Sequence, residues 1–152
     1  MPHLVLMVGL PGAGKTTRAR QLEVSLPALR LTPDEWILRL LGADAGRPAQ
    51  DAIRDSVEAV LTDLAMRALT LGVNVILDFG FWSREERDRF RALGETVGAS
   101  SEIVFVDAPL TELKRRVSTR SPHNTLSISA TEMDEFARAF EPPEPDELQV
   151  RV

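Results

Sequence analysis

The feature that most constrains this 152-residue chain is a complete match to the phosphate-binding pattern G-x-x-x-x-G-K-[ST] near its beginning. In this pattern the glycines let successive backbone N–H groups point at a phosphate, the lysine adds positive charge, and the last hydroxyl can bind Mg²⁺. The phosphate loop consists of Gly9, Leu10, Pro11, Gly12, Ala13, Gly14, Lys15 and Thr16, and Thr17 follows it. The motif predicts a bound nucleotide with Mg²⁺.

The residues around the phosphate loop have the pattern that such a loop requires. Residues 3–8 form a short apolar run, and residues 15–26 contain helix formers with Ala19 and Leu22 spaced for burial. A strand, a loop and a helix in this order point the helix N-terminus at the phosphates. This setting argues against a chance glycine turn.

Length, composition and charge narrow the class of protein. A chain of 152 residues with 43% hydrophobic residues fits one domain, residues 1–152. The net charge of −5 gives no general attraction to nucleic acid, so a nucleic-acid partner is not expected. The absence of cysteine excludes zinc thiolates and cysteine nucleophiles and favours the cytoplasm. No apolar run reaches the roughly 18 residues of a membrane span, and the sequence does not indicate an oligomeric state.

Apolar runs alternate with helical patterns along the chain. Helix starts are indicated by Thr32 with Glu35, Ser83 with Glu86, and Ser129 with Glu132. Strands are expected at 3–8, 28–31, 73–77, 103–106 and 148–152, and helices at 15–26, from 33, 50–71, from 83 to about 94 or 98, 110–120 and 129–140. This alternation predicts an α/β fold, a three-layer sandwich whose parallel sheet of about five strands has helices on both faces. Together with the phosphate loop before the first helix, it indicates a fold of the P-loop NTPase type. A short lid is expected at about 115–130.

Ligands of parallel sheets bind at the carboxyl ends of the strands. That rule selects the phosphate loop, Asp34, residues 78–83 and Asp107. Asp34 is a candidate catalytic base, or an N-terminal helix residue favoured by the helix dipole. Asp78 ends an apolar run, as a Mg²⁺-organising aspartate does, or it orients the acceptor.

In this order, several segments resemble the small P-loop kinases typified by zeta toxins, chloramphenicol phosphotransferase and the phage-type polynucleotide kinase. They are residues 9–17, 32–36 and 75–78, the pair Arg116 and Arg120, and residues 140–143. The resemblance implies that Asp34 accepts the proton of the hydroxyl group being phosphorylated. It also implies that Arg116 and Arg120, four residues apart on one helix face, contact the phosphates or the adenine. Several relatives have an arginine where this chain has Ile37, which weakens the case for a nucleic acid 3′-phosphate as acceptor.

Aromatic residues lie close to both candidate carboxylates. Phe79, Phe81 and Trp82 follow Asp78 directly, and Trp36 lies two residues after Asp34. We expect Trp36, Phe81 and Trp82 to line an acceptor pocket, although Phe79 and Phe81 are equally suited to anchoring the loop on the core. Arg87, one turn into the next helix, faces either the pocket or solvent.

These residues predict a kinase that transfers phosphate from Mg²⁺-ATP to an alcohol of a small molecule such as an antibiotic, a nucleoside or a sugar. Lys15, Asp34, Arg116 and Arg120 are the expected catalytic residues, and Thr16 and Asp78 the expected Mg²⁺ residues. No guanine-reading N-K-x-D run is present, which favours ATP over GTP. Two other functions stay open, a nucleic-acid end kinase and a nucleotide-gated switch that forms no phosphorylated product.

Overall fold

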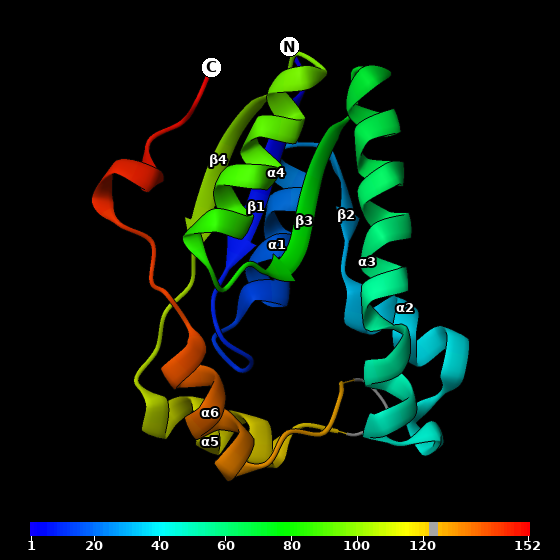
Figure 1. Cartoon of the computed structure of the whole chain (residues 1–152), viewed down its shortest axis with the longest axis vertical. Helices are drawn as coiled ribbons and strands as arrows, with labels where there is room; N and C mark the ends of the chain where they lie inside the picture. Colours follow the sequence, from blue (N-terminus) through cyan, green and yellow to red (C-terminus); the bar gives the residue numbers. More distant parts are fainter. Residues whose placement is uncertain (122–124) are drawn as a thin grey trace.

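The computed structural model describes residues 1–121 and 125–152 (Figure 1). Its centre is a parallel sheet of four strands in the order β2-β3-β1-β4. The strands are β1 (His3–Val8), β2 (Ala28–Leu31), β3 (Asn74–Gly80) and β4 (Ser100–Phe105). β1 lies in the interior of the sheet, and all of its apolar side chains are buried. This explains why its sequence is a continuous apolar run without alternating polar residues.

Helices cover both faces of the sheet. Leu4, Leu6 and Val8 of β1 share one core cluster with side chains of α3 and α4, and Val5 and Met7 share another with α1. Figure 1 shows the same layers, with α3 and α4 in front of the sheet and α1 behind it. The helices are α1 (Lys15–Ser25), α2 (Pro33–Leu41), α3 (Arg47–Thr70), α4 (Arg84–Thr96), α5 (Leu110–Thr119) and α6 (Ala130–Ala139), with short 3-10 turns at Ala43–Ala45 and Pro145–Leu148. The predicted three-layer α/β fold is confirmed.

The helices α5 and α6 lie together beyond the carboxyl ends of the strands (Figure 1). Their buried residues Leu113, Val117 and Met133 form a cluster with Leu10 and Ala13 of the phosphate loop. Residues 122–124 of the expected lid lie outside the described residues.

Three of the predicted strands differ from the structure, and the sheet in the described residues has four strands where about five are expected. β4 spans Ser100–Phe105 and not 103–106. The strand predicted at 148–152 is wrong, because a 3-10 turn ends at Leu148 and only Arg151 forms a single antiparallel bridge, to Ser101. The proline at 145 and the clustered acids favour a turn over a strand there. β3 continues to Gly80, so Asp78 lies inside the strand and not after it.

Helix starts agree with the sequence at three positions, with one difference in detail. The side chains of Ser83 and Ser129 accept hydrogen bonds from the backbone N–H groups of Glu86 and Glu132. α2 begins at Pro33 as expected, but the Thr32 side chain makes no capping bond. Its hydroxyl group instead donates a hydrogen bond to the Asp78 carboxylate at 3.0 Å, so it binds a residue of β3 and does not cap the helix. In the described part of the chain, no helix is both long enough and apolar enough to span a bilayer.

Candidate active site

The phosphate loop connects the end of β1 to the start of α1. Gly14 precedes the helix with a φ of 102°, in the left-handed region that side chains rarely adopt. Gly12 has a φ of 85°, and a Cβ atom there would lie 3.1 Å from the Leu113 carbonyl oxygen of α5. Both glycines are therefore required by the backbone, the first by the turn into α1 and the second by the close approach of α5.

Lys15 is the first residue of α1, and the charges of two nearby carboxylates act on it. Burial lowers the pKa of the Lys15 ammonium group, and the charges of Asp78 and Asp34 act in the opposite direction. An anionic phosphate next to this ammonium group would compensate for its lost hydration. The surroundings of Lys15 thus suit a phosphate ligand.

Asp78 joins the phosphate loop to β2 and β3. Its Oδ2 atom accepts hydrogen bonds from the hydroxyl groups of Thr16, at 2.6 Å, and Thr32, at 3.0 Å. Its Oδ1 atom is buried and has no hydrogen-bond partner among the described residues. Mg²⁺ prefers oxygen ligands and keeps several bound waters. The carboxylate oxygen without a partner, beside a threonine hydroxyl, is therefore suited to bind Mg²⁺ or one of those waters. No group of three His, Asp or Glu residues in the described segments could hold a metal by itself, so nucleotide phosphates would have to supply further ligands.

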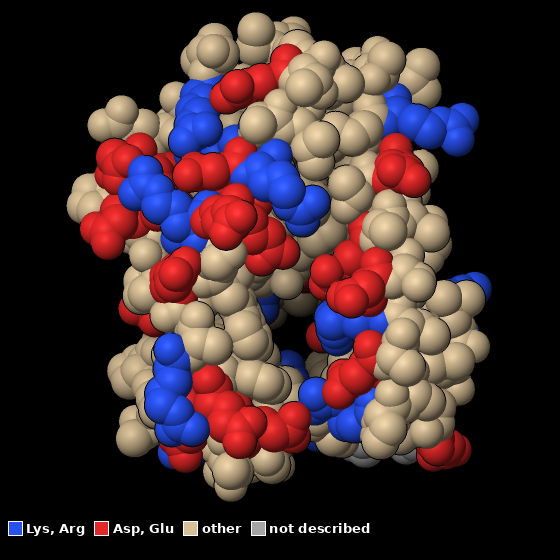
Figure 2. Space-filling model, viewed as in Figure 1, with Lys and Arg blue, Asp and Glu red and all other residues tan. Residues whose placement is uncertain are grey.

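Two cavities meet at the phosphate loop. The first, which we call the nucleotide cavity, measures about 640 Å³. The second, the acceptor cavity, measures about 430 Å³ and extends between α3 and α6. Figure 2 shows a hollow between the part of the molecule that contains α5 and α6 and the side formed by α2 and α3. Lys15, Thr16 and Asp34 line both cavities, so the phosphate loop and the candidate base face a shared space.

Asp34 lies in the first turn of α2, where its carboxylate is partly exposed to both cavities. Nη2 of Arg54, which comes from α3, donates to its Oδ1 at 2.6 Å. The same guanidinium lies 3.8 Å from a carboxylate oxygen of Glu58. Ile37, at the position where several relatives have arginine, is fully buried in the core. The arginine beside the candidate base therefore comes from a different helix.

Arg116 and Arg120 both line the nucleotide cavity but do not share a helix face. Arg116 lies on α5 and donates to the carbonyl oxygens of Gly12, at 3.0 Å, and Ala13, at 3.3 Å. Arg120 follows the end of α5 in an extended conformation and donates to the Leu126 carbonyl oxygen at 3.1 Å. Its buried Nε has no partner among the described residues. Arg116 is thus committed to the backbone of the phosphate loop, whereas Arg120 makes no hydrogen bond to that loop within the described residues.

Of the other residues predicted to bind the nucleotide, some line the nucleotide cavity and some do not. Pro11, Gly12, Gly14 and Thr17 line the nucleotide cavity. Gly9 and Ala13 shape the loop without being among the residues that line either cavity, and Leu10 packs in the cluster with α5.

Aromatic side chains form one wall of the acceptor cavity. Phe81, Trp82 and Phe136 line it, and the rings of Trp82 and Phe136 lie 4.8 Å apart. Phe81 also serves the core, because it packs against Phe79 and Phe90. Phe81 thus lines the cavity and also anchors the loop on the core, and the binding of an acceptor at this wall stays a prediction.

Two predicted acceptor residues lie elsewhere. Trp36, on α2, is 39% exposed and is not among the residues that line either cavity. Arg87 faces neither the pocket nor solvent, because its side chain is fully buried against Glu147. The expectation for Arg87 is wrong because its ion-pair partner comes from the end of the chain, 60 residues away.

Sequence reasoning missed the charged wall that faces the aromatic one. Four of its residues, Arg47, Asp51, Arg54 and Glu58, lie on α3, and Glu86 lies on α4. Their spacing of four, three and four residues along α3 is the spacing of one helix face, and this signal was available in the sequence. Burial raises the pKa of Glu58 to about 7, although Arg54 acts against this shift.

Comparisons with known proteins identify the family and the fold of this chain. Residues 4–143 match the family model described as an AAA domain. The chain is 29% identical to the bifunctional enzyme NodQ of Rhizobium meliloti, aligning over its whole length but spanning only about a quarter (24%) of that protein.

Solved structures with the same fold include several kinases. A candidate kinase from Chloroflexus aurantiacus has a TM-score of 0.75 and 21% identity, with 95% of this chain and 83% of that chain covered. A chain of the Pnkp1/Rnl/Hen1 RNA repair complex has a TM-score of 0.74 and 22% identity, with 91% and 43% covered. The APS kinase of Mycobacterium tuberculosis, solved with AMPPNP and APS, has a TM-score of 0.58 and 26% identity, with 78% and 69% covered. This chain therefore belongs to the AAA-domain family and has the fold of P-loop kinases.

Proposed function

We propose that the protein transfers the γ-phosphate of Mg²⁺-ATP to a hydroxyl group of an uncharged small molecule, such as a sugar, a nucleoside or an antibiotic alcohol. The observation that carries this proposal is that Asp34, Lys15 and Thr16 line both cavities at once. A nucleotide in one cavity and an alcohol in the other would meet at these residues.

The proposed roles follow from the positions of the side chains. Lys15 and the loop N–H groups bind the phosphates, and Thr16 and Asp78 hold Mg²⁺, which when bound neutralises phosphate charge. Asp34 accepts the hydroxyl proton while the alcohol oxygen bonds to the γ-phosphorus and the bond from that phosphorus to the ADP oxygen breaks. Arg120 donates to the phosphate oxygens, and Arg116 holds α5 on the phosphate loop.

The charges of the acceptor cavity favour an uncharged acceptor. Apart from Lys15 and Asp78, the cavity is lined by two arginines and four carboxylates. Both arginines are already paired, Arg54 with Asp34 and Arg47 with Asp51 and Glu132. An anionic acceptor would find no free guanidinium there and would be repelled by the excess carboxylates. Hydroxyl groups, by contrast, can both donate to the carboxylates and accept from the arginines.

A direct test incubates the protein with Mg²⁺-ATP and a mixture of sugars, nucleosides and alcohol-bearing antibiotics, and detects phosphorylated products by mass spectrometry. We expect one product class, formed by the wild type and reduced roughly 10²- to 10⁴-fold in Asp34→Asn, because a positioned base contributes that much. Asp63→Asn, an exposed acid on α3 outside both cavities, is the matched control and should keep full activity. Full activity of Asp34→Asn on the identified acceptor would refute the role of Asp34 as base.

A nucleic-acid end kinase is the second candidate, since a chain of an RNA repair complex has this fold. The net charge of −5 and the paired arginines argue against it. Filter binding of an RNA oligonucleotide over a salt series distinguishes the two functions. Salt-sensitive binding together with end labelling of the RNA would favour the second.

A further inference from the structure

Arg87 is the most completely enclosed charged residue near the acceptor cavity, with 0% of its surface exposed. Its Nε and Nη2 atoms donate to the two carboxylate oxygens of Glu147, at 2.7 and 3.2 Å. Its Nη1 atom donates to the carbonyl oxygens of Phe81 and Glu141, both at 2.9 Å. One buried guanidinium thus joins the loop before α4 to a segment more than 50 residues later in the sequence.

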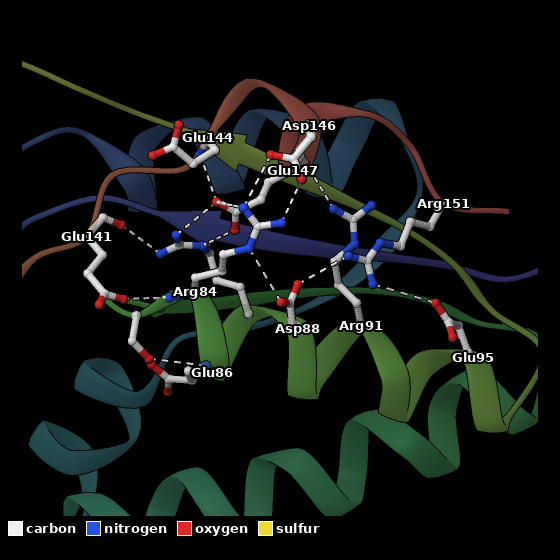
Figure 3. A network of polar contacts seen from close by, with 12 residues as sticks. Arg84, Glu86, Asp88, Arg91, Glu95, Glu141, Glu144, Asp146, Glu147 and Arg151 are labelled. Atoms are coloured by element: carbon white, nitrogen blue, oxygen red, sulfur yellow. Dashed lines mark hydrogen bonds and ion pairs between the residues drawn. The ribbon is translucent and has the colours of Figure 1, made fainter.

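The segment from Glu141 to Gln149, which we call the strap, runs beside α4 and β4 after α6 ends (Figure 1). Figure 3 shows the polar network that attaches it to α4. Arg84 pairs with Asp146 at 2.6 Å, and Arg91 donates to the carbonyl oxygens of Glu147, at 2.6 Å, and Gln149, at 2.7 Å. The strap is therefore held along its length by arginines of one helix.

The strap also touches the aromatic wall of the acceptor cavity. The backbone N–H of Glu141 donates to the carbonyl oxygen of Trp82 at 2.8 Å. Phe81 has a φ of 44°, a strained value for a residue with a side chain. Such a conformation persists only where the surroundings hold it, and the Phe81 carbonyl is held by Arg87. The shape of this wall thus depends on contacts made outside the cavity.

We propose that Arg87, paired with Glu147, is a positioning residue that sets the aromatic wall of the acceptor cavity by clamping Phe81 and Trp82 to the strap. This inference rests on the proposed function in assigning that wall to the acceptor. Arg87 does not touch the acceptor itself, because its guanidinium is saturated by Glu147 and two carbonyl oxygens. It acts through the backbone of residues 81–82.

The chain offers a matched control for this role. Arg91 is also 0% exposed and also donates to the strap, but its other hydrogen bonds within the described residues go to Ser101 of β4 and not to Phe81 or Trp82. Lysine at either position keeps the charge and loses the planar set of donors. Arg87→Lys and Arg91→Lys therefore remove similar buried contacts and differ in the contact with the wall.

The experiment compares these two variants by Trp82 fluorescence, in a Trp36→Phe background so that Trp82 is the only tryptophan. We expect both to lower the melting temperature, and only Arg87→Lys to shift the emission of Trp82 and its quenching by acrylamide in the folded protein. With an identified acceptor, Arg87→Lys should raise the acceptor KM at least about tenfold and leave the ATP KM within about twofold. Arg91→Lys should leave both KM values near those of the background protein.

A second variant keeps the test decisive if Arg87→Lys does not fold. Glu147→Gln retains Arg87 and weakens its pairing, and we expect the same Trp82 signature in milder form. Equal Trp82 emission and quenching in the Arg87 and Arg91 variants would overturn the clamp, as would unchanged spectra in Glu147→Gln. The fluorescence result does not depend on transfer, so the absence of any phosphorylated product would count against the proposed function alone.

Discussion

Three carboxylates near the phosphate loop have different environments and therefore different uses. Asp78 accepts from two hydroxyl groups and keeps one buried oxygen without a partner in the described residues. Asp34 is held by Arg54 beside the shared space of the two cavities. Glu58 is mostly buried with only a distant arginine, and its pKa rises to about 7. These differences suit Asp78 to binding a metal, Asp34 to acting as a base, and Glu58 to changing its protonation near neutral pH.

The raised pKa of Glu58 predicts how the free energy of unfolding changes with pH. The folded protein keeps the Glu58 proton up to about pH 7, whereas the unfolded chain loses it near 4.5. The folded state therefore binds more protons between these values, and the free energy of unfolding falls as pH rises through this window. We expect Glu58→Gln to remove this fall and to be about 1–2 kcal/mol more stable than the wild type at pH 8, after allowance for solvent screening.

Urea unfolding at pH 4.5 and pH 8 checks this prediction. The gain of Glu58→Gln should be smallest at pH 4.5, and Asp63→Asn on the same helix should show no such pH-dependent gain. A Glu58→Gln protein that gains nothing at pH 8 relative to pH 4.5 would show that the Glu58 carboxyl is not perturbed.

The residues that the sequence could predict are those fixed by local pattern. The phosphate loop and Asp34 follow strands and Asp78 lies near the end of one, and their placement at one edge of the sheet needs only the order of the elements. Arg54 and Arg87 could not be assigned in this way. Their partners, Asp34 and Glu147, lie 20 and 60 residues away, and such pairs depend on how helices pack.

At the scale of elements, α5 is docked directly on the phosphate loop. A Cβ atom at residue 12 would lie 3.1 Å from both the Leu113 carbonyl oxygen and Cγ1 of Val117. Arg116 completes the contact through the Gly12 and Ala13 carbonyl oxygens. The conformation of the loop and the position of α5 are thus coupled.

This coupling can be tested with a pair of glycine substitutions. Gly12→Ala combines a positive φ with the contact to α5, whereas Gly98→Ala has a similar φ, 74°, with nothing within 4 Å. We expect each to lose about 1 kcal/mol of stability from backbone strain. Only Gly12→Ala should also weaken ADP binding, measured by calorimetry. Equal ADP affinity in the two variants would mean that α5 is not coupled to nucleotide binding.

Most elements could be predicted because apolar periodicity and helix caps are local signals. The end of the chain could not, because residues 145–152 are held by tertiary contacts such as the bond from Arg91 to Gln149 and not by a strand pattern. The Thr32 cap was misjudged for a related reason. Its hydroxyl donates to Asp78, 46 residues away, which the local cap pattern cannot reveal.

At the scale of the whole molecule, the sheet directs the loops that follow β1, β2 and β3 to one edge, and α5 and α6 lie across that edge (Figure 1). Both cavities lie there, and the phosphate loop lines each of them. Lys15 and Arg120 both line the nucleotide cavity and bring positive charge to it. The architecture thus places the phosphate loop where a nucleotide is proposed to bind.

The most direct test of this account is a calorimetric titration of the protein with ATP in the presence of Mg²⁺. The chain has two lysines, which supply a matched pair of variants. We expect saturable binding of one ATP per chain by the wild type and by Lys114→Ala, whose side chain pairs with Asp134 on the surface, and a loss of affinity of at least about 10²-fold in Lys15→Ala. Undetectable ATP binding by the wild type, or equal affinity in the two lysine variants, would contradict the account.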